Sequence, residues 1–214
     1  DLARGNNDGN IFVTATGGNV TFNAGTDDRS YAMIGHGGLY QGGGDFTQNG
    51  NIDVDASGNV AFASGGGTQN WKFAQIGHGG MQTNGVKTGT IDVTAGGQID
   101  FDASASAGTE NFVKIGHGGH QSNGNASGAI TVAANNGPIN FTGGNGQSAF
   151  AQIGHGGRES KGDFTDDISV IATGGGIEFL SGNGTWAFTQ IGHGGSGANP
   201  PVNFGNQSGN IKVQ

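Results

Sequence analysis

Apolar and polar residues alternate over short stretches that recur along the whole chain. In "NIDVDASGNVAFAS", Ile52 and Val54 alternate with aspartates, and after the turn "SGN" Val60 and Phe62 alternate with alanine. A period of two is typical of a β-strand with one buried face. No helical period occurs anywhere, and the density of glycine opposes helix formation. The pattern predicts an all-β protein.

Three elements of this kind recur in phase. The first is an Ile-x-Val pair, found at Ile11/Val13, Ile52/Val54, Ile91/Val93, Ile130/Val132, Ile168/Val170 and Ile211/Val213. The second is a Val/Ile-x-Phe pair, found at Val20/Phe22, Val60/Phe62, Ile99/Phe101, Ile139/Phe141 and Ile177/Phe179. The third is an aromatic-containing run that ends in "IGHGG", with its histidine at His36, His78, His117, His155 and His193. Self-similarity at a fixed period of this size indicates a repeat fold.

Three short strands, their turns and one variable loop make a natural circuit for one coil of a parallel β-solenoid, with coils of about 38 residues. A propeller is the competing fold, because its blades have a similar length. Each unit has three convincing strands where a blade needs four, and no Trp-Asp signature is present. We therefore predict a solenoid.

The whole chain, 1–214, is predicted to be a single solenoid segment of five coils plus the first strand of a sixth. The approximate repeats are 11–51, 52–90, 91–129, 130–167, 168–210 and a partial 211–214. Neither end shows a polar cap, which an isolated solenoid needs over its open edge strands. The expectation is a segment of a longer rod, or ends that dock onto neighbouring subunits of a fibre.

The motif histidines are predicted to form one column at a corner of the coil, where the neighbouring glycines permit positive φ. We interpret this column as a structural ladder. Metal binding is the alternative, but residues one coil apart lie in a line and no carboxylate recurs in phase with the motif. His120, close to His117, is a possible local exception. Catalytic groups are not expected in every coil, so no catalytic residue, metal or cofactor is assigned. If the column is buried, acid below about pH 6 should destabilise the fold.

The strand before each motif has two faces. In "FAQIGHGG", Ala74, Ile76 and His78 share one face, while Phe73 and Gln75 share the other. Gln or Lys recurs beside the aromatic, so this second face is expected to look outward. Its aromatics, preceded in two coils by a tryptophan, are the candidate binding surface: Tyr31, Phe73, Phe112, Phe150 and Phe188, with Trp71 and Trp186. Packing of this column under the variable loop or in the core is the favoured interpretation, and a binding surface is the alternative.

Composition narrows the range of partners. Only 11% of the residues are charged, the net charge is −8 and no basic patch occurs, so we expect no nucleic-acid partner. No apolar run is long enough to insert into a membrane. Cysteine is absent, which rules out disulfides. The calcium-binding Gly-Gly-x-Gly-x-Asp repeat is not found either.

The stretches "GNIDVDASGNVAFAS", "GTIDVTAGGQIDFDAS" and "GAITVAANNGPINFTGG" resemble the repeats of large filamentous-haemagglutinin-like exoproteins. The resemblance covers essentially the whole chain. It implies a right-handed β-helix in a secreted or cell-surface bacterial protein, with adhesive or scaffold work and no catalytic residues. It also implies self-association into a fibre or continuation in a longer chain, and a glycan or host-cell receptor as possible partner. A carbohydrate-binding or polysaccharide-degrading β-helix protein is the alternative.

Overall fold

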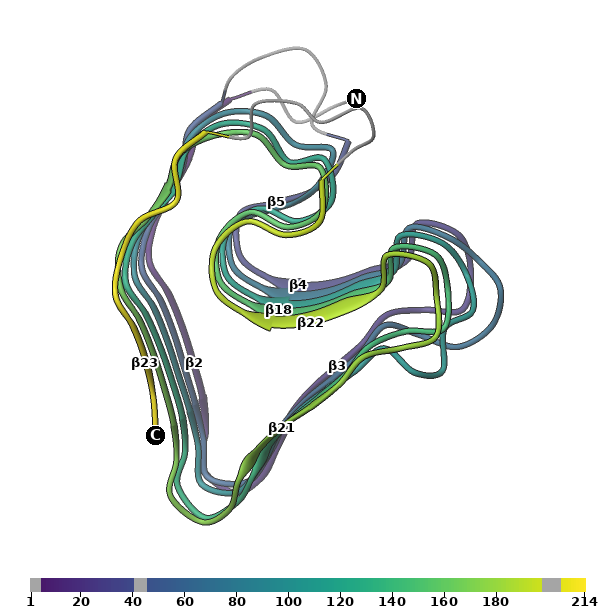
Figure 1. The fold of residues 1–214 in the computed structure, drawn as a ribbon. Helices are drawn as coiled ribbons and strands as arrows, with labels where there is room; N and C mark the ends of the chain where they lie inside the picture. Colours follow the sequence, from purple (N-terminus) through teal and green to yellow (C-terminus); the bar gives the residue numbers. More distant parts are fainter. Residues whose placement is uncertain (1–4, 41–45, 198–204) are drawn as a thin grey trace.

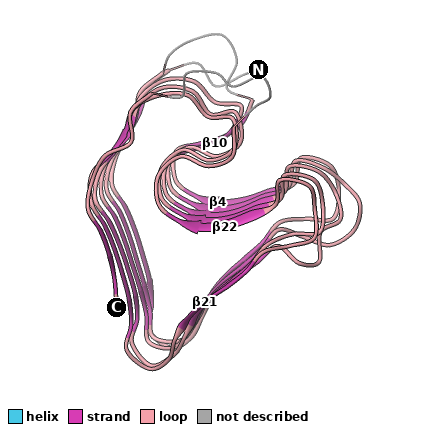
Figure 2. Ribbon diagram, viewed as in Figure 1, coloured by secondary structure: helices cyan, strands magenta, loops and turns pink. Residues whose placement is uncertain are grey.

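In the computed structural model, which describes residues 5–40, 46–197 and 205–214, the chain winds into a parallel β-solenoid. All regular structure in these residues is strand (Figure 2). Each strand pairs with its counterpart one coil along, as Ile52 does with Ile11 and Ile91. Viewed along the axis, the chain turns counter-clockwise as it advances toward the viewer from β2 to β23 (Figure 1). The predicted right-handed solenoid is therefore confirmed.

Three strands per coil build three sheets, as predicted. The Ile-Val sheet contains β2 (Ile11–Ala15), β7 (Ile52–Ala56), β12 (Ile91–Ala95), β16 (Ile130–Ala134), β20 (Ile168–Ala172) and β23 (Ile211–Val213). The Phe sheet contains β3 (Val20–Asn23), β8 (Val60–Ala63), β13 (Ile99–Asp102), β17 (Ile139–Thr142) and β21 (Ile177–Leu180). The motif sheet contains β4 (Tyr31–Ile34), β9 (Phe73–Ile76), β14 (Phe112–Ile115), β18 (Phe150–Ile153) and β22 (Phe188–Ile191).

Two further sets of very short strands were not predicted. One runs through β1 (Asn7–Asp8), β6 (Gln48–Asn49), β11 (Lys87–Thr88), β15 (Ala126–Ser127) and β19 (Phe164–Thr165). The other pairs β5 (Gly37–Leu39) with β10 (Gly79–Met81). Strands of two or three residues are too short to show an alternation, so the sequence pattern does not reveal them.

The main core lies between the three sheets. Identical residues stack from coil to coil, so that Phe62 lies between Phe22 and Phe101 with ring centroids 4.8 and 4.9 Å apart. Such ring pairs contribute about 0.5–1.5 kcal/mol each beyond the area they bury. Ile52 and Val93, from neighbouring coils of the Ile-Val sheet, are no more than 1% exposed. The repeated apolar positions thus form continuous columns along the axis.

A second core covers the other face of the motif sheet. After each motif the chain doubles back, which places β5 and β10 above that face (Figure 1). Phe73, Met81, Phe112 and Phe150 are buried there with no exposed surface. The expectation that this face looks outward is therefore wrong: Gln75 and Lys114 on the same face are also fully buried.

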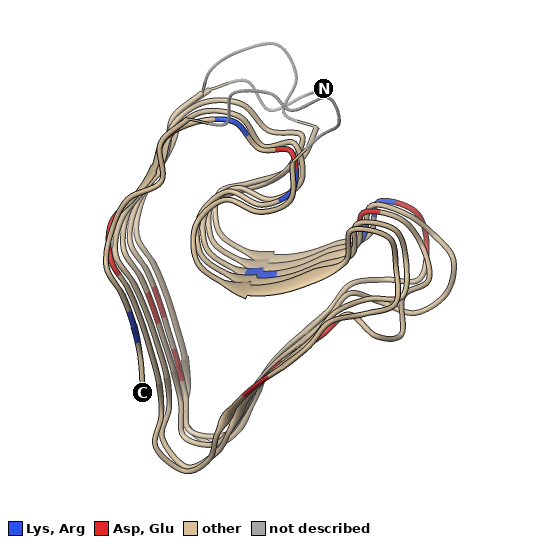
Figure 3. Cartoon of the chain, viewed as in Figure 1, with Lys and Arg blue, Asp and Glu red and all other residues tan. Residues whose placement is uncertain are grey.

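Polar residues at the corners tie one coil to the next. The side-chain oxygen of Asn51 accepts the backbone N–H of Thr90 at 3.0 Å, and that of Asn59 accepts the N–H of Gln98 at 3.0 Å. Charged residues are sparse and lie mainly on the outer walls and loops (Figure 3). Much of the polar composition therefore serves the stacking of coils.

Candidate functional site

The five motif histidines stack in one column along the solenoid. Their ring centroids lie 4.9, 4.8, 4.8 and 5.0 Å apart, and neighbouring rings are within 9° of parallel. His78, His117 and His155 have no exposed surface, whereas His36 and His193 are partly exposed. The question of whether the column faces the core or solvent is thus settled for the three inner coils, where it is buried.

Both ring nitrogens of each inner histidine are hydrogen-bonded. Nδ1 of His117 accepts the backbone N–H of His78 at 3.0 Å, and its Nε2 lies 2.9 Å from the carbonyl oxygen of Gly89. An acceptor at Nδ1 and a carbonyl at Nε2 leave only one tautomer, with the proton on Nε2. The same pair of contacts recurs at His78, with His36 and Gly50, and at His155, with His117 and Gly128. Each histidine therefore joins two coils and also fastens the motif turn to the opposite wall.

Burial makes these histidines poor bases. Desolvation lowers the pKa of His78 to about 4 and that of His155 to about 3. Desolvation also holds the pKa of His117 well below its ordinary value of 6.5, and the neighbouring His155 and His78 lower it further. At His193, which is nearer the surface, desolvation again lowers the pKa. The inner column is neutral across the physiological pH range.

Glutamines on the second face of the motif strand donate hydrogen bonds to the IGHGG turn of the next coil. Nε2 of Gln75 donates to the carbonyls of Gly116 and Gly118 at 2.9 and 2.8 Å. Gln152 donates in the same way to Gly192 and Gly194, one coil further along. These buried amides satisfy carbonyls of the glycine-rich turn that would otherwise lack partners.

Lys114 takes the place of glutamine in the third coil. Its ammonium group donates to Oε1 of Gln152 at 2.9 Å and to the carbonyl of Gly154. Complete burial holds the pKa of this amine well below 10.5. Lys114 is therefore the one position in the column of Gln75 and Gln152 where burial of the charged form is unfavourable.

Most of the predicted aromatic surface is buried. Phe73, Phe112 and Phe150 stack 4.9 and 4.8 Å apart inside the second core. For these three the favoured interpretation, a packed column, agrees with the structure, and the alternative of a binding surface does not. The doubling back of the chain after the motif covers them. Tyr31 in the first coil is 47% exposed, and Phe188 in the last is partly exposed. Trp71 is partly buried, and Trp186 is 49% exposed.

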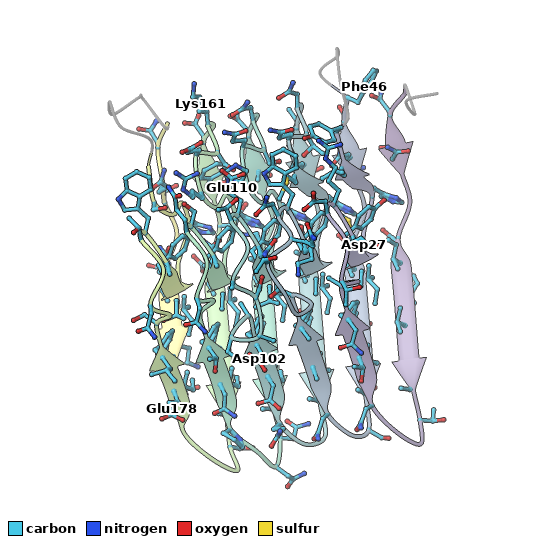
Figure 4. All side chains as sticks on the ribbon, turned by 90° about the vertical axis from the view of Figure 1, so that its right-hand side faces the viewer. Asp27, Phe46, Asp102, Glu110, Lys161 and Glu178 are labelled. Carbon is cyan, nitrogen blue, oxygen red and sulfur yellow. The ribbon has the colours of Figure 1, made fainter. Side chains whose placement is uncertain are left out.

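Two parallel columns of left-handed residues lie just before and just after the segment that encloses the second core, and we call them together the mouth strip. They are Arg29, Trp71, Glu110, Ser148 and Trp186 on the loops before the motif sheet, and Tyr40, Gln82, Gln121 and Glu159 after the motifs. All nine have φ between 52° and 64°, and they include all but one of the non-glycine residues with positive φ in the described chain. Figure 4 looks onto this side, with Glu110 among the side chains of successive coils.

Glu110, in the first column of the mouth strip, contacts side chains that directly precede members of the second column. Its carboxylate accepts Nε1–H of Trp71 and lies 3.2 Å from Nε2 of His120 and 3.6 Å from a guanidinium nitrogen of Arg158. The hydrogen bond with His120 is the main cause that lowers the pKa of Glu110. His120 thus lies beside a single carboxylate. No group of three or more metal-ligating side chains occurs in the described ranges.

Apart from Trp71 and Trp186, the mouth strip escaped the sequence analysis because no single residue type recurs in every coil. The column that begins with Arg29 continues through tryptophan, glutamate, serine and a second tryptophan, so it has no letter common to all coils. The position of this first column is a usable signal, because each of its members lies two residues before the aromatic that opens the motif strand.

A scan against protein-family models matched none, and searches of the curated proteins and of the solved structures each returned no match to the chain. The described part of the chain holds no helix that could cross a lipid bilayer.

Proposed function

We propose that this chain is a structural and adhesive segment of a bacterial cell-surface or secreted fibre, a rod-like scaffold without enzymatic activity. One observation carries the proposal: the side chains best suited to chemistry are already engaged in holding coils together. Both nitrogens of His117 are hydrogen-bonded, and the ring is fully buried between two others. A histidine in this state offers no lone pair to a metal or a substrate.

The proposed mechanism is mechanical. Strand pairing runs parallel to the axis through every sheet, and columns of phenylalanine, histidine and amide side chains run beside it. A pull along the axis is then shared by many hydrogen bonds and ring contacts per coil. We further propose that the rod self-associates end to end or continues in a longer chain, with a glycan or cell-surface receptor as its ligand.

The rival function is polysaccharide cleavage, and it has one candidate acid. Glu110 is the carboxylate of the one non-repeated cluster of ion pairs in the described residues. We expect no cleavage when the purified chain is incubated with a panel of polysaccharides and reducing ends are measured. Cleavage that Glu110→Gln abolishes, with Asp55→Asn on the outer wall as the control that retains it, would overturn the scaffold proposal.

A further inference from the structure

The mouth strip holds large side chains in a backbone conformation that glycine would adopt without strain. A residue with a Cβ is strained in the left-handed region, and the strip repeats that strain in coil after coil. Strain of this kind concentrates where a side chain must be held for function. The strain of the mouth strip is therefore a reason to ask what its side chains face.

The chemistry of the mouth strip combines flat rings with planar polar groups. Trp71 and Tyr40 pack edge to face, and the guanidinium of Arg29 lies 4.7 Å from the Trp71 ring centroid. Arg158 lies 5.3 Å from the ring centroid of Trp186. Aromatic rings suit the apolar face of a sugar, whose C–H bonds pack on π-systems.

A line of amides and a carboxylate follows the second column. Nε2 of Gln82 donates to Oε1 of Gln121 at 2.8 Å, and Nε2 of Gln121 donates to Glu159 at 2.7 Å. These hydrogen bonds fix the orientation of each side chain in the row. The remaining lone pairs and N–H groups can bind the hydroxyls of a ligand. Fixed polar groups beside flat rings are the usual composition of a site that binds an orientated polar molecule.

The spacing of the mouth strip fits a polymer. Corresponding residues are repeated once per coil, about 4.8 Å along the axis, so Trp71 and Trp186, three coils apart, lie roughly 14 Å from each other. An extended β-linked glycan advances by about one ring length per sugar, close to one coil. A ligand of several sugars could then contact both tryptophans.

The charges in and around the mouth strip favour an uncharged glycan as its ligand. The guanidinium of Arg158 is matched by Glu159 at 2.6 Å and by Glu110 at 3.6 Å. The chain as a whole carries a net charge of −8, which repels acidic polymers. We propose that the mouth strip binds an extended, uncharged polysaccharide along the solenoid axis. This ligand supplies the adhesive part of the proposed function, but the scaffold would stand without it.

Tryptophan fluorescence tests this proposal directly, because the only two tryptophans of the chain belong to the mouth strip. The purified chain is titrated with soluble β-glucan, mannan and xylan, and with the anionic polymers alginate and heparin. We expect a saturable fluorescence change with at least one uncharged polymer and none with the anionic ones. Affinity electrophoresis in gels that contain the same polymers gives the second readout.

Variants separate binding from folding. Trp186→Ala is expected to weaken binding at least tenfold, Trp186→Phe to retain most of it and Gln121→Ala to weaken it several-fold. Phe12→Ala is the matched control, since Phe12 is 71% exposed on the Ile-Val sheet, outside the mouth strip. Thermal melts identify any variant that fails to fold, and if Trp186→Ala is such a variant, Gln121→Ala carries the test.

Three results would overturn the inference: no saturable response to any uncharged polymer, a response to anionic polymers alone, or equal loss of binding in Phe12→Ala. None of them affects the scaffold proposal, which concerns the stacking of coils.

Discussion

A neutral imidazole is the only form of His117 that fits its place in the column. Protonation at Nδ1 would remove the acceptor of the His78 N–H and place a positive charge between two stacked rings 4.8 Å away on either side. The glycines around each histidine leave room for this close approach. At the scale of single residues, the motif is thus a set of hydrogen bonds that depends on one protonation state.

Stability should fall as pH drops from 8 to 5. The pKa of His78 is about 4 in the folded protein and 6.5 in the unfolded chain, so the unfolded state takes up the proton first. The contribution of a neutral His78 is complete above pH 6.5 and is lost as pH falls toward 4. Each fully buried histidine then costs about 2 kcal/mol by pH 5. Thermal melts at pH 8, 6.5 and 5 measure the loss, and equal midpoints would contradict the buried column.

His117→Phe isolates one rung of the column. Phenylalanine retains a flat ring but leaves the His78 N–H and the Gly89 carbonyl without partners. We expect a loss of about 1–3 kcal/mol for each unpaired group at pH 8. The further loss between pH 8 and 5 should be smaller than in the parent chain, because one titrating group is gone.

Lys114→Gln should stabilise the protein at neutral pH. Burial lowers the pKa of the Lys114 amine well below 10.5 in the folded state, so the folded protein favours the charged form less than the unfolded chain does. Glutamine matches the column of Gln75 and Gln152 and carries no charge. We expect a gain of at least about 1 kcal/mol in the free energy of unfolding from urea denaturation. Lys212→Gln, at an exposed position of β23, is the control and should change nothing; equal effects would contradict the account.

At the scale of the element, the corner after the motif strand requires glycine. Gly77 has φ +142°, and a Cβ there would meet the carbonyl of Gly116 in the next coil. Because that neighbour is backbone, no side chain can move aside to make room. The close stacking of coils is therefore built into the corner.

Gly77→Ala should destabilise the protein by about 2 kcal/mol or more, which lowers the thermal midpoint by about 5 °C. Gly17→Ala is the matched control, since a Cβ at Gly17 meets nothing within 4 Å. Differential scanning calorimetry of both variants makes the comparison. Similar midpoints for the two variants would show that the corner tolerates a side chain.

The elements with a strong alternation were predictable, and those without one were not. Ile52 and Val54 fix their strand and its inward face, since each pairs with an identical residue one coil along. Gln75 was misplaced because a polar residue on a strand normally faces water. Its burial depends on the doubling back of the chain, which rests on glycine corners and strands of two or three residues. The glycine corners recur in every coil, but strands this short show no alternation of apolar and polar residues.

At the scale of the whole molecule, the columns make the solenoid a continuous object along its axis. The five described coils share one register in every sheet, and the phenylalanine and histidine stacks cross all of them. The shape of the solenoid, and its resistance to any axial load, thus depend on one contact that is repeated between neighbouring coils. The proposed fibre extends this same contact beyond one segment.

Electron microscopy of cells that make the protein, labelled with antibodies raised against the purified chain, tests the fibre most directly. We expect label along thin extracellular filaments, whose diffraction shows a meridional spacing of about 4.8 Å. Label confined to the cell interior, or to compact particles without that spacing, would contradict the account.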